Sequence, residues 1–492
     1  MKRLATAAAA LLLCAAAPLG AGAQPLWDPA EFLDESTLDV VVLDDWHVDT
    51  VNGMTRQKLV DIHVAEWWPG FEYRVRVRYI VPLGGPATGI HLTGGHSANS
   101  LLSDFRVAGF NAELIAGDIG LVHTVVQALL TGGDPTQQAM IAQFLATLNP
   151  RYTRWWIWVM TEMRAITAAY TETAHFIPGK VAATGGSKNC ATPTIASIND
   201  SRFTAVFGKA CSPWLSPLNV FDQDTMDEVE AVNTWFFEAL ASGEISPGIH
   251  NEEWYADKSF GADDDMHVLA LQAGWTLEEY RVLAQSVVPY VHLSETYDAL
   301  VAGGNEYLFQ PGTHDWVAFD MPEGQAAYPQ IPVYLRANTG HSQPAHPAAE
   351  PSEDNQEVFL SRHFFGVVTP MLETPSTRYT LARDQLTVAV TFANGPEPAS
   401  GRMWWLYDRH PGGSGAYLWE LIPAGQFADM TFDPVDGAWK ATIQIDPRRG
   451  SIDFWSNHGH VVDGAQTYLS SLYTRLDIPS RWRRGGRRVF NR

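Results

Sequence analysis

The stretch Val181-Ala182-Ala183-Thr184-Gly185-Gly186-Ser187-Lys188-Asn189-Cys190 decides how this chain is expected to fold. A run of small and β-branched residues ends in Gly-Gly-Ser, and a helix-like segment follows at 192–197. This order is typical of a strand that turns sharply into a helix with a serine at the apex. Such a turn requires glycine, because the serine is strained and a side chain two residues before it would collide with the helix. The sequence therefore places Gly186 and Ser187 at the apex of a strand–helix elbow.

The chain on both sides of this elbow alternates strands with helices. Alternating polar and apolar residues predict paired strands at 58–68 and 71–81, after an acidic and irregular segment at 24–50. Helical spacing of apolar residues predicts a helix over 152–170. Further strands are expected at 87–92, 111–116, 203–210, 306–310 and 331–336, and a further helix at 353–365. These units predict a mainly parallel sheet that helices cover on both faces.

The length of the chain, 492 residues, exceeds what one ordinary core contains, so more than one folded unit is expected. Residues 24–375 would form the α/β domain. Within it, 212–296 has a helical pattern rich in Trp, Pro and acids, which predicts a cap over the carboxyl edge of the sheet. Strict alternation with turn residues beyond Pro375 predicts a separate immunoglobulin-like β-sandwich over 376–480.

The first 23 residues have the pattern of a secretory signal. Met1-Lys2-Arg3 precede an apolar run at 4–13, and small residues precede Gln24. The apolar run is too short to span a bilayer, and no later stretch reaches the needed length. We therefore expect an exported protein, periplasmic or extracellular, without stable membrane insertion.

The charge of the chain argues against general binding of nucleic acid. Its formal net charge is −22, and removal of the signal would make it more acidic still. Six arginines crowd the segment 481–492, which could bind an acidic surface. A solvated, disordered basic tail is the favoured interpretation of that segment.

Two cysteines, Cys190 and Cys211, would remain after removal of the signal, which contains Cys14. In an oxidising compartment the two could pair. Cys190 lies in the first turn of the helix after the elbow, and Cys211 follows the apolar run 203–210. Both points lie at the same edge of a parallel sheet, so a bridge between them is geometrically plausible.

A serine nucleophile needs a base in contact with it and a carboxylate that orients the base. On a parallel sheet these groups lie on loops at the carboxyl ends of strands. Ser187, Asp315 and His341 each follow an expected strand. Their order in the chain, Ser, Asp, His, is that of the α/β-hydrolases. We therefore predict an α/β-hydrolase-like fold in which these three residues form a catalytic triad.

The tetrahedral intermediate of such a reaction requires two backbone N–H donors. Lys188, directly after the nucleophile, would supply one of them. The turn Gly94-Gly95-His96 would supply the other, from Gly95 or His96, because glycines let backbone amides approach a ligand closely.

Each part of this site has alternatives. The acid has rivals at Asp118, Asp200, Asp222 and Glu306, of which Asp118 and Asp200 are expected to cap turns or helices. His96, His314 and His346 lie near the predicted site, but no two have the helical spacing of metal ligands with a carboxylate. Acidic clusters at 222–228 and 263–265 lack the glycine and terminal glutamate of a calcium loop. No metal and no cofactor are therefore predicted.

Several blocks of the sequence resemble one known family. Thr184-Gly185-Gly186-Ser187-Lys188 and Asn199-Asp200-Ser201-Arg202-Phe203 resemble the Gly-x-Ser-Lys and Asp-x-Arg blocks of the PhoPQ-activated pathogenicity-related proteins. Other similar blocks are Leu92-Thr93-Gly94-Gly95-His96, Met163-Arg164-Ala165, Asn338-Thr339-Gly340-His341 and Leu469-Ser470-Ser471. The similarity covers most of the mature chain.

This resemblance implies an exported bacterial protein with an α/β-hydrolase-like fold and a C-terminal β domain. It implies a site and not a reaction, because the substrates of the family are poorly defined. The sequence departs from the family at Asn189-Cys190, where members usually carry Arg-Gly. The missing glycine bears on the tight packing of helix against strand, and a Cys190–Cys211 bridge would be a compensation.

The leading hypothesis is a secreted serine hydrolase that cleaves an ester, or less readily an amide, of a small molecule or peptide. The cap would shape the substrate pocket. The alternative is a non-catalytic binding or signalling protein on a hydrolase scaffold, since fold does not fix function. In that case the side chains of Ser187, Asp315 and His341 would not converge.

Overall fold

The structure is a computed structural model of the whole chain. The residues that it describes are 26–126, 135–147, 149–186, 188–209, 304–313, 331–339, 345–350, 354–366, 370–382, 384–408 and 422–479. Predictions for the signal (1–23), the cap (212–296), the basic tail (481–492) and Cys211 lie outside these residues.

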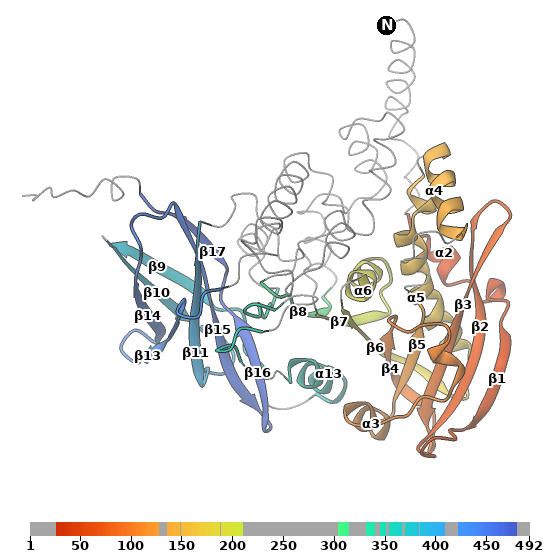
Figure 1. Ribbon diagram of the computed structural model, residues 1–492. Coiled ribbons are helices and arrows are strands. Elements are labelled where there is room, and N and C mark those ends of the chain that lie inside the picture. Colours follow the sequence, from red (N-terminus) through yellow and green to blue (C-terminus); the bar gives the residue numbers. More distant parts are fainter. Residues whose placement is uncertain are drawn as a thin grey trace, which may run out of the picture.

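An eight-stranded sheet forms the centre of the N-terminal part (Figure 1). Its strands run in the order β1-β2-β3-β5-β4-β6-β7-β8. They are β1 (Val41–Val48), β2 (Thr55–Trp68), β3 (Phe71–Pro82), β4 (Ala87–Thr93), β5 (Ile119–Thr124), β6 (Phe176–Gly186), β7 (Phe203–Lys209) and β8 (Glu306–Gln310). The first three strands are antiparallel to their neighbours, and the pairings from β5 through β8 are parallel. The predicted mainly parallel sheet is thus confirmed as a mixed sheet with mostly parallel strands.

The segment expected as a last strand at 331–336 is only partly paired. It makes two isolated parallel bridges, from Val333 to Phe309 and from Arg336 to Gly312. It therefore extends the sheet beyond β8 in the same direction, as the sequence predicted, without forming a continuous ladder.

Helices cover both faces of the sheet. They are α2 (Pro29–Phe32), α3 (Phe110–Ala116), α4 (Pro135–Thr147), α5 (Arg154–Thr171), α6 (Lys188–Asn199) and α13 (Asn355–Phe365), with short 3₁₀ turns η1 (Glu35–Thr37), η2 (Ser100–Leu102) and η3 (Pro150–Tyr152). Val181 and Ala183 of β6 pack with α5 and α6, whereas Ala182 between them packs with α13. This alternation buries both sides of the middle of β6 and explains why Val181, Ala182 and Ala183 are all apolar.

Two expectations for the N-terminal part are wrong. Residues 111–116, expected as a strand, form most of α3, which buries Leu114 and Ile115 on one face; the strand of that unit is β5 instead. Six residues are too few to distinguish helical from strand periodicity. Residues 24–50, expected to be irregular, contain the edge strand β1, most of whose side chains are exposed and give no alternation.

The C-terminal part consists of two antiparallel sheets, as the alternating pattern predicted. One has the order β13-β14-β10-β9, and the other β12-β11-β15-β16 with β17 also paired to β15. The strands are β9 (Ser376–Ala382), β10 (Gln385–Thr391), β11 (Ser400–Tyr407), β12 (Phe427–Asp429), β13 (Thr431–Asp433), β14 (Ala438–Gln444), β15 (Ser451–Val462), β16 (Ala465–Ser470) and β17 (Thr474–Asp477).

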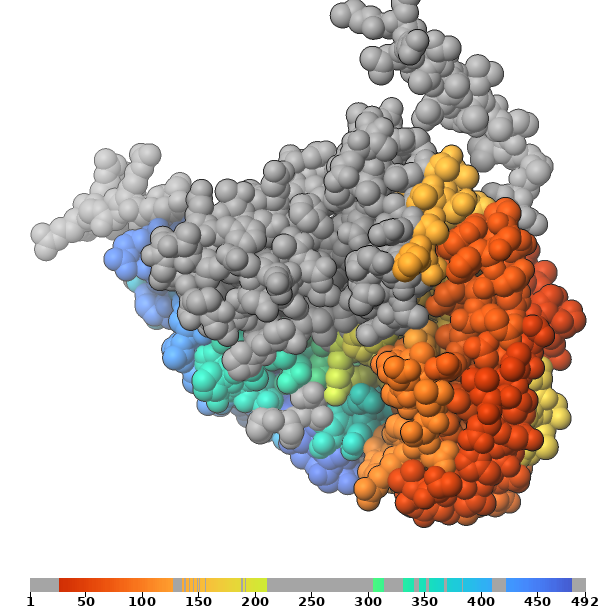
Figure 2. Space-filling model, turned by 45° about the vertical axis from the view of Figure 1, so that its right-hand side comes forward, coloured from red at the N-terminus to blue at the C-terminus, as the bar shows by residue number. Residues whose placement is uncertain are grey.

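The all-β part and the α/β part contribute residues to one buried cluster. Val333 and Leu335 pack in one buried cluster with Trp404 and Trp455. The Ser470 N–H donates to the Val333 carbonyl at 2.8 Å. The space-filling view shows the green and teal residues of the middle of the chain between the red-to-yellow N-terminal part and the blue C-terminal strands (Figure 2).

None of the described helices is long and apolar enough to cross a membrane.

Candidate active site at the strand switch point

The strand order reverses around β4, which has β5 on one side and β6 on the other, both parallel to it. In open α/β sheets, ligands bind at the carboxyl ends of the strands at such a switch point. The turn Gly94-Gly95-His96 follows β4, and the predicted elbow follows β6. The two pieces of the site expected from sequence are therefore neighbours at the position that the topology favours.

The backbone on both sides of Ser187 has the predicted form. Strand β6 ends at Gly186 and helix α6 begins at Lys188, so a single residue joins them. A Cβ on Gly185 would lie 2.0 Å from the Asn189 carbonyl oxygen, a contact that no side chain can make. The prediction that a side chain two residues before the serine would collide with the helix is therefore confirmed. Ser187 itself lies outside the described residues.

The departure from the family pattern at Asn189-Cys190 is accommodated by a glycine on the neighbouring strand. A Cβ on Gly208 of β7 would lie 2.1 Å from the Cys190 sulfur, so only glycine leaves room for this buried side chain. Close packing of helix on sheet is thus retained, with the small residue on the strand. The Cys190–Cys211 pair stays a prediction, because Cys211 lies outside the described residues.

The Gly94-Gly95-His96 turn leaves one N–H group unused. The Val126 N–H donates to the Gly94 carbonyl at 2.8 Å, and the His96 N–H lies 3.4 Å from the Thr124 carbonyl. No described residue accepts a hydrogen bond from the Gly95 N–H, and Gly95 is exposed. Of the two predicted donors, the geometry favours Gly95 over His96.

The same turn lies against the first turn of α6. A Cβ on Gly95 would be 3.1 Å from Asn189 Nδ2, so Gly95 and the start of α6 are in contact. The first N–H groups of a helix lack intrahelical partners and carry partial positive charge. A free glycine N–H beside a helix N-terminus is an arrangement that stabilises a developing oxyanion.

Three histidines lie under and beside this turn. His96 stacks on His123 with ring centroids 4.2 Å apart, and its Nε2 lies 2.9 Å from Thr93 Oγ1. His91 Nε2 lies 2.8 Å from Thr184 Oγ1. Burial lowers the pKa of His91 to about 4 and lowers the pKa of both His96 and His123. The three imidazoles are therefore neutral at pH 7, and they form an uncharged polar group next to the turn.

The segments that lead to the other two predicted triad residues lie side by side. The Thr313 N–H donates to the Arg336 carbonyl at 2.9 Å, and the Asn338 N–H donates to Thr313 Oγ1 at 2.8 Å. Residues 311–313 continue β8 beyond its carboxyl end, and residues 333–336 run parallel to that strand. Asp315 and His341 follow within a few residues, but both lie outside the described residues, so their convergence on Ser187 stays a prediction.

The described rivals of Asp315 have structural roles. Asp118 occupies a turn with φ 61° before β5. Asp200 Oδ1 accepts a hydrogen bond from the Arg202 N–H at 3.0 Å, which caps the turn before β7, and the Asp200 carboxylate also pairs with the Arg202 guanidinium at 2.6 Å. Glu306 is the first residue of β8, so it lies at the amino end of the strand, away from the candidate site. It pairs with His363 at 3.2 Å. Asp222 lies outside the described residues.

The blocks that contain Arg164 and Arg202, and that resembled the PhoPQ-activated family, hold neighbouring segments against helix α5. Arg202 donates to the Met163 carbonyl at 2.9 Å and to Thr167 Oγ1 at 2.8 Å, which ties the α6–β7 turn to α5. Arg164, on the same helix, donates to the Asp34 carbonyl at 2.5 Å. These blocks support the site without taking part in it.

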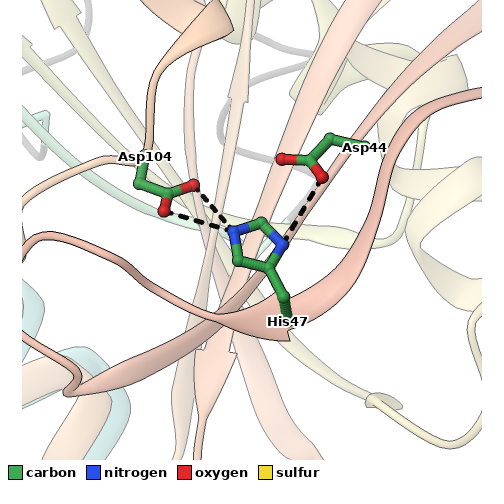
Figure 3. Close-up of side chains that lie close together, drawn as sticks. All are labelled: Asp44, His47 and Asp104. Carbon is green, nitrogen blue, oxygen red and sulfur yellow. Dashed lines mark hydrogen bonds and ion pairs between the residues drawn. The ribbon is translucent and has the colours of Figure 1, made fainter.

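One group of His and acidic side chains among the described residues brings its ligand atoms within 4.8 Å of one another: Asp44, His47 and Asp104 (Figure 3). His47 Nε2 lies 3.0 Å from Asp104 Oδ1, and Nδ1 lies 2.8 Å from the Asp45 carbonyl. Both nitrogens thus face oxygen acceptors, which fits a protonated imidazolium. Arg78 also donates to Asp104 Oδ1 at 3.1 Å. A metal ion would compete with two cations here, so the group is an ion-pair network.

Sequence reasoning missed one buried acid in the site. Glu162 of α5 is 1% exposed, and its Oε1 lies where a side chain on Gly94 would be, 2.7 Å from a Cβ at that position. The available signal was an acidic residue, the only one in α5, between Met160 and Met163. A carboxyl group at such a position is buried, and a buried carboxyl group requires an explanation.

Comparisons with known proteins give structural similarities and no sequence match. No protein-family model matches the chain, and no curated protein matches it. The chain covers 52% of the length of a glucuronoyl esterase from Solibacter usitatus, with 14% identity, 35% of this chain covered and a TM-score of 0.26.

Two further solved structures are covered over more of their length. Acetyl xylan esterase 1 from Thermoanaerobacterium sp. JW/SL YS485 has 13% identity and a TM-score of 0.38, with 70% of this chain and 95% of that chain covered. A CE15 glucuronoyl esterase from Teredinibacter turnerae T7901 has 11% identity and a TM-score of 0.38, with 67% and 79% covered. Similarities this low carry no argument, so the architecture is described by its own strand order and by the close strand–helix junction of β6 and α6.

Proposed function

We propose that this protein is an exported serine hydrolase that cleaves esters. Ser187 is the nucleophile, His341 the base, and Asp315 the carboxylate that orients His341. The backbone N–H groups of Lys188 and Gly95 hold the oxyanion. The substrate class is a small-molecule or peptide ester, with an amide as the harder alternative.

The observation that carries this proposal is the contact between the Gly94-Gly95 turn and the start of α6. It supports a site where the Gly95 N–H, which has no partner among the described residues, lies beside the N-terminus of α6. Removal of one such donor typically slows acyl transfer by about 10²–10³-fold. Such donors stabilise the charge that develops on a substrate carbonyl oxygen when a nucleophile attacks the carbonyl carbon.

The reaction follows the usual two-step course. Ser187 Oγ attacks the ester carbonyl carbon while its proton passes to His341, and the carbonyl oxygen becomes an oxyanion between the two N–H donors. Collapse of the intermediate breaks the ester C–O bond, and His341 returns the proton to the departing alcohol. Water then attacks the acyl-enzyme with His341 again as base, which releases the carboxylic acid and restores Ser187.

Other features belong to the same proposal. Residues 24–375 form the hydrolase domain with its cap at about 212–296, and 376–480 form an immunoglobulin-like domain docked on it. The chain is exported after removal of residues 1–23, and Cys190 pairs with Cys211. Membership of the PhoPQ-activated pathogenicity-related family is supported by the sequence blocks alone.

A fluorophosphonate probe tests the proposal, because it reacts with activated serines without requiring knowledge of the substrate. Wild-type protein is expected to be labelled at Ser187, and Ser187→Ala is expected to remain folded and unlabelled. Hydrolysis of p-nitrophenyl acetate should be lost in the same variant. Equal labelling of the two proteins, or no labelling of a folded wild type, would favour the non-catalytic binding protein.

A further inference from the structure

Glu162 is an acid without a charged partner at the wall of the proposed oxyanion site. It lies in the middle of α5, 1% exposed, with Oε1 against Gly94. Its Oε2 is buried and has no hydrogen-bond partner among the described residues. Gly94 has no room for a side chain, because a Cβ there would lie 2.4 Å from Val126 Cγ2 and 2.7 Å from Glu162 Oε1. The carboxyl group thus fills the space behind the turn.

Among the described residues, no cation and no hydrogen-bond donor stabilises a carboxylate at Glu162. Burial alone raises its pKa well above the usual value, and no charged residue contributes to the shift. The titratable groups on the adjoining strand ends are His91, His96 and His123, which burial keeps neutral. On α5 itself, Arg164 is turned toward the Asp34 carbonyl, and Arg154 lies over the Trp158 ring.

We propose that Glu162, held as a neutral carboxylic acid, positions the Gly94-Gly95 turn so that the Gly95 N–H faces the oxyanion. This inference rests on the proposed function. The carboxyl group is a positioning residue, since it acts through the turn and not on the substrate. Neutrality is essential to the role, because a carboxylate behind the turn would oppose the negative charge that develops on its other side.

This arrangement sets an alkaline limit on catalysis. When Glu162 loses its proton at high pH, two negative charges would share a buried site during the reaction. We expect kcat to fall by about tenfold or more across that ionisation. A residue with only a packing role would produce no such limb in the pH profile.

The test compares wild type with Glu162→Gln, which has the same shape and no ionisable proton. Wild type is expected to lose hydrolysis of p-nitrophenyl acetate at alkaline pH, with kcat more affected than KM, while Glu162→Gln stays active over the same range. Glu113→Gln is the matched control, because Glu113 is an exposed acid on α3; it should keep the wild-type profile. An unchanged alkaline limb in Glu162→Gln would overturn the inference.

A second measurement separates this inference from the proposed function. The infrared difference between wild type and Glu162→Gln at pH 7 should contain the carbonyl band of a protonated carboxyl group. A carboxylate band would refute the inference even in an active enzyme. If the folded wild type neither reacts with fluorophosphonate nor hydrolyses esters, the proposed function fails, whatever the protonation state of Glu162.

Discussion

Two polar clusters lie at opposite ends of the parallel strands of the central sheet, called here the amino edge and the carboxyl edge. They contain similar groups but differ in whether those groups have hydrogen-bond partners. At the amino edge, His363 of α13 lies 2.9 Å from Thr204 Oγ1 and 3.2 Å from Glu306 Oε1. The Thr204 hydroxyl also binds both the N–H and the carbonyl of Val181, at 3.0 and 2.9 Å. At the carboxyl edge, by contrast, Asn189 Oδ1, Glu162 Oε2 and His91 Nδ1 are buried without a partner among the described residues.

The difference distinguishes a structural cluster from a functional one. The hydroxyl, imidazole and carboxylate at the amino edge have the composition of a catalytic triad, but each group is occupied by the fold. Buried polar groups are normally satisfied, so unsatisfied ones that gather in one place need a reason. Under the proposed function, that reason at the switch point is the reacting group, and local rules are expected to be broken at such a site.

The strongest test of this comparison changes the elbow itself. Gly185→Ala would place a Cβ 2.0 Å from the Asn189 carbonyl, so α6 must move. We expect a loss of about 3 kcal/mol or more in the free energy of unfolding, at the upper end for overpacking. Urea denaturation measures the change.

Gly186→Ala is the neighbouring control. Its Cβ would meet only the Lys209 carbonyl at 3.5 Å, an ordinary contact. It should therefore cost less than about 1 kcal/mol in stability. Equal losses in the two variants would show that the helix does not depend on close approach at Gly185.

The contrast between these two glycines also shows how far the sequence could predict the fold. Gly185 was identified because an elbow needs space at that position, and β6, α5 and the paired strands β2 and β3 follow from periodicity. Strand β1 escaped prediction because an edge strand with exposed side chains has no apolar face to alternate. Helix α3 was taken for a strand because six residues do not resolve a period.

The site was less accessible to sequence reasoning than the fold. The choice between Gly95 and His96 required knowing which N–H the neighbouring strand occupies, and that depends on the pairing of Gly95 with Val125. Glu162 lies 68 positions from Gly94, on another element, and only packing brings the two together. A motif identifies functional residues that are close together in the sequence. A buried residue from another element, such as Glu162, is marked only by its unusual residue type within its own helix.

A second test compares one substitution in each of the two clusters. His363→Ala removes a partner from both Thr204 and Glu306, and His363 also lowers the pKa of Glu306 by hydrogen bonding to it. We expect the unfolding free energy to fall by about 2 kcal/mol, with ester hydrolysis per folded molecule unchanged. Asn189→Ala should cost less than about 1 kcal/mol, because Asn189 Oδ1 has no bond to lose. Thermal and urea denaturation measure the stability of each variant, and turnover of p-nitrophenyl acetate measures its activity. Equal losses of stability in the two variants would contradict the comparison.

The smallest expected effect concerns His47, which links the edge strand β1 to the loop that follows the Gly94-Gly95 turn. Its hydrogen bond to the Asp45 carbonyl raises its pKa above 6.5, and Asp104 adds to the shift. A raised folded pKa means that the protonated ring contributes stability that is complete below pH 6.5 and is lost as the pH rises through the folded pKa. Because the pair is partly exposed, the contribution should not exceed about 1 kcal/mol.

His47→Gln isolates this contribution. The variant should be less stable than wild type at pH 5.5, and the difference should shrink as the pH rises through the folded pKa of His47 and the wild-type imidazole loses its proton. Urea denaturation at a series of pH values measures the difference at each point. A difference that stays constant with pH would mean that His47 is held by packing and not by its charge.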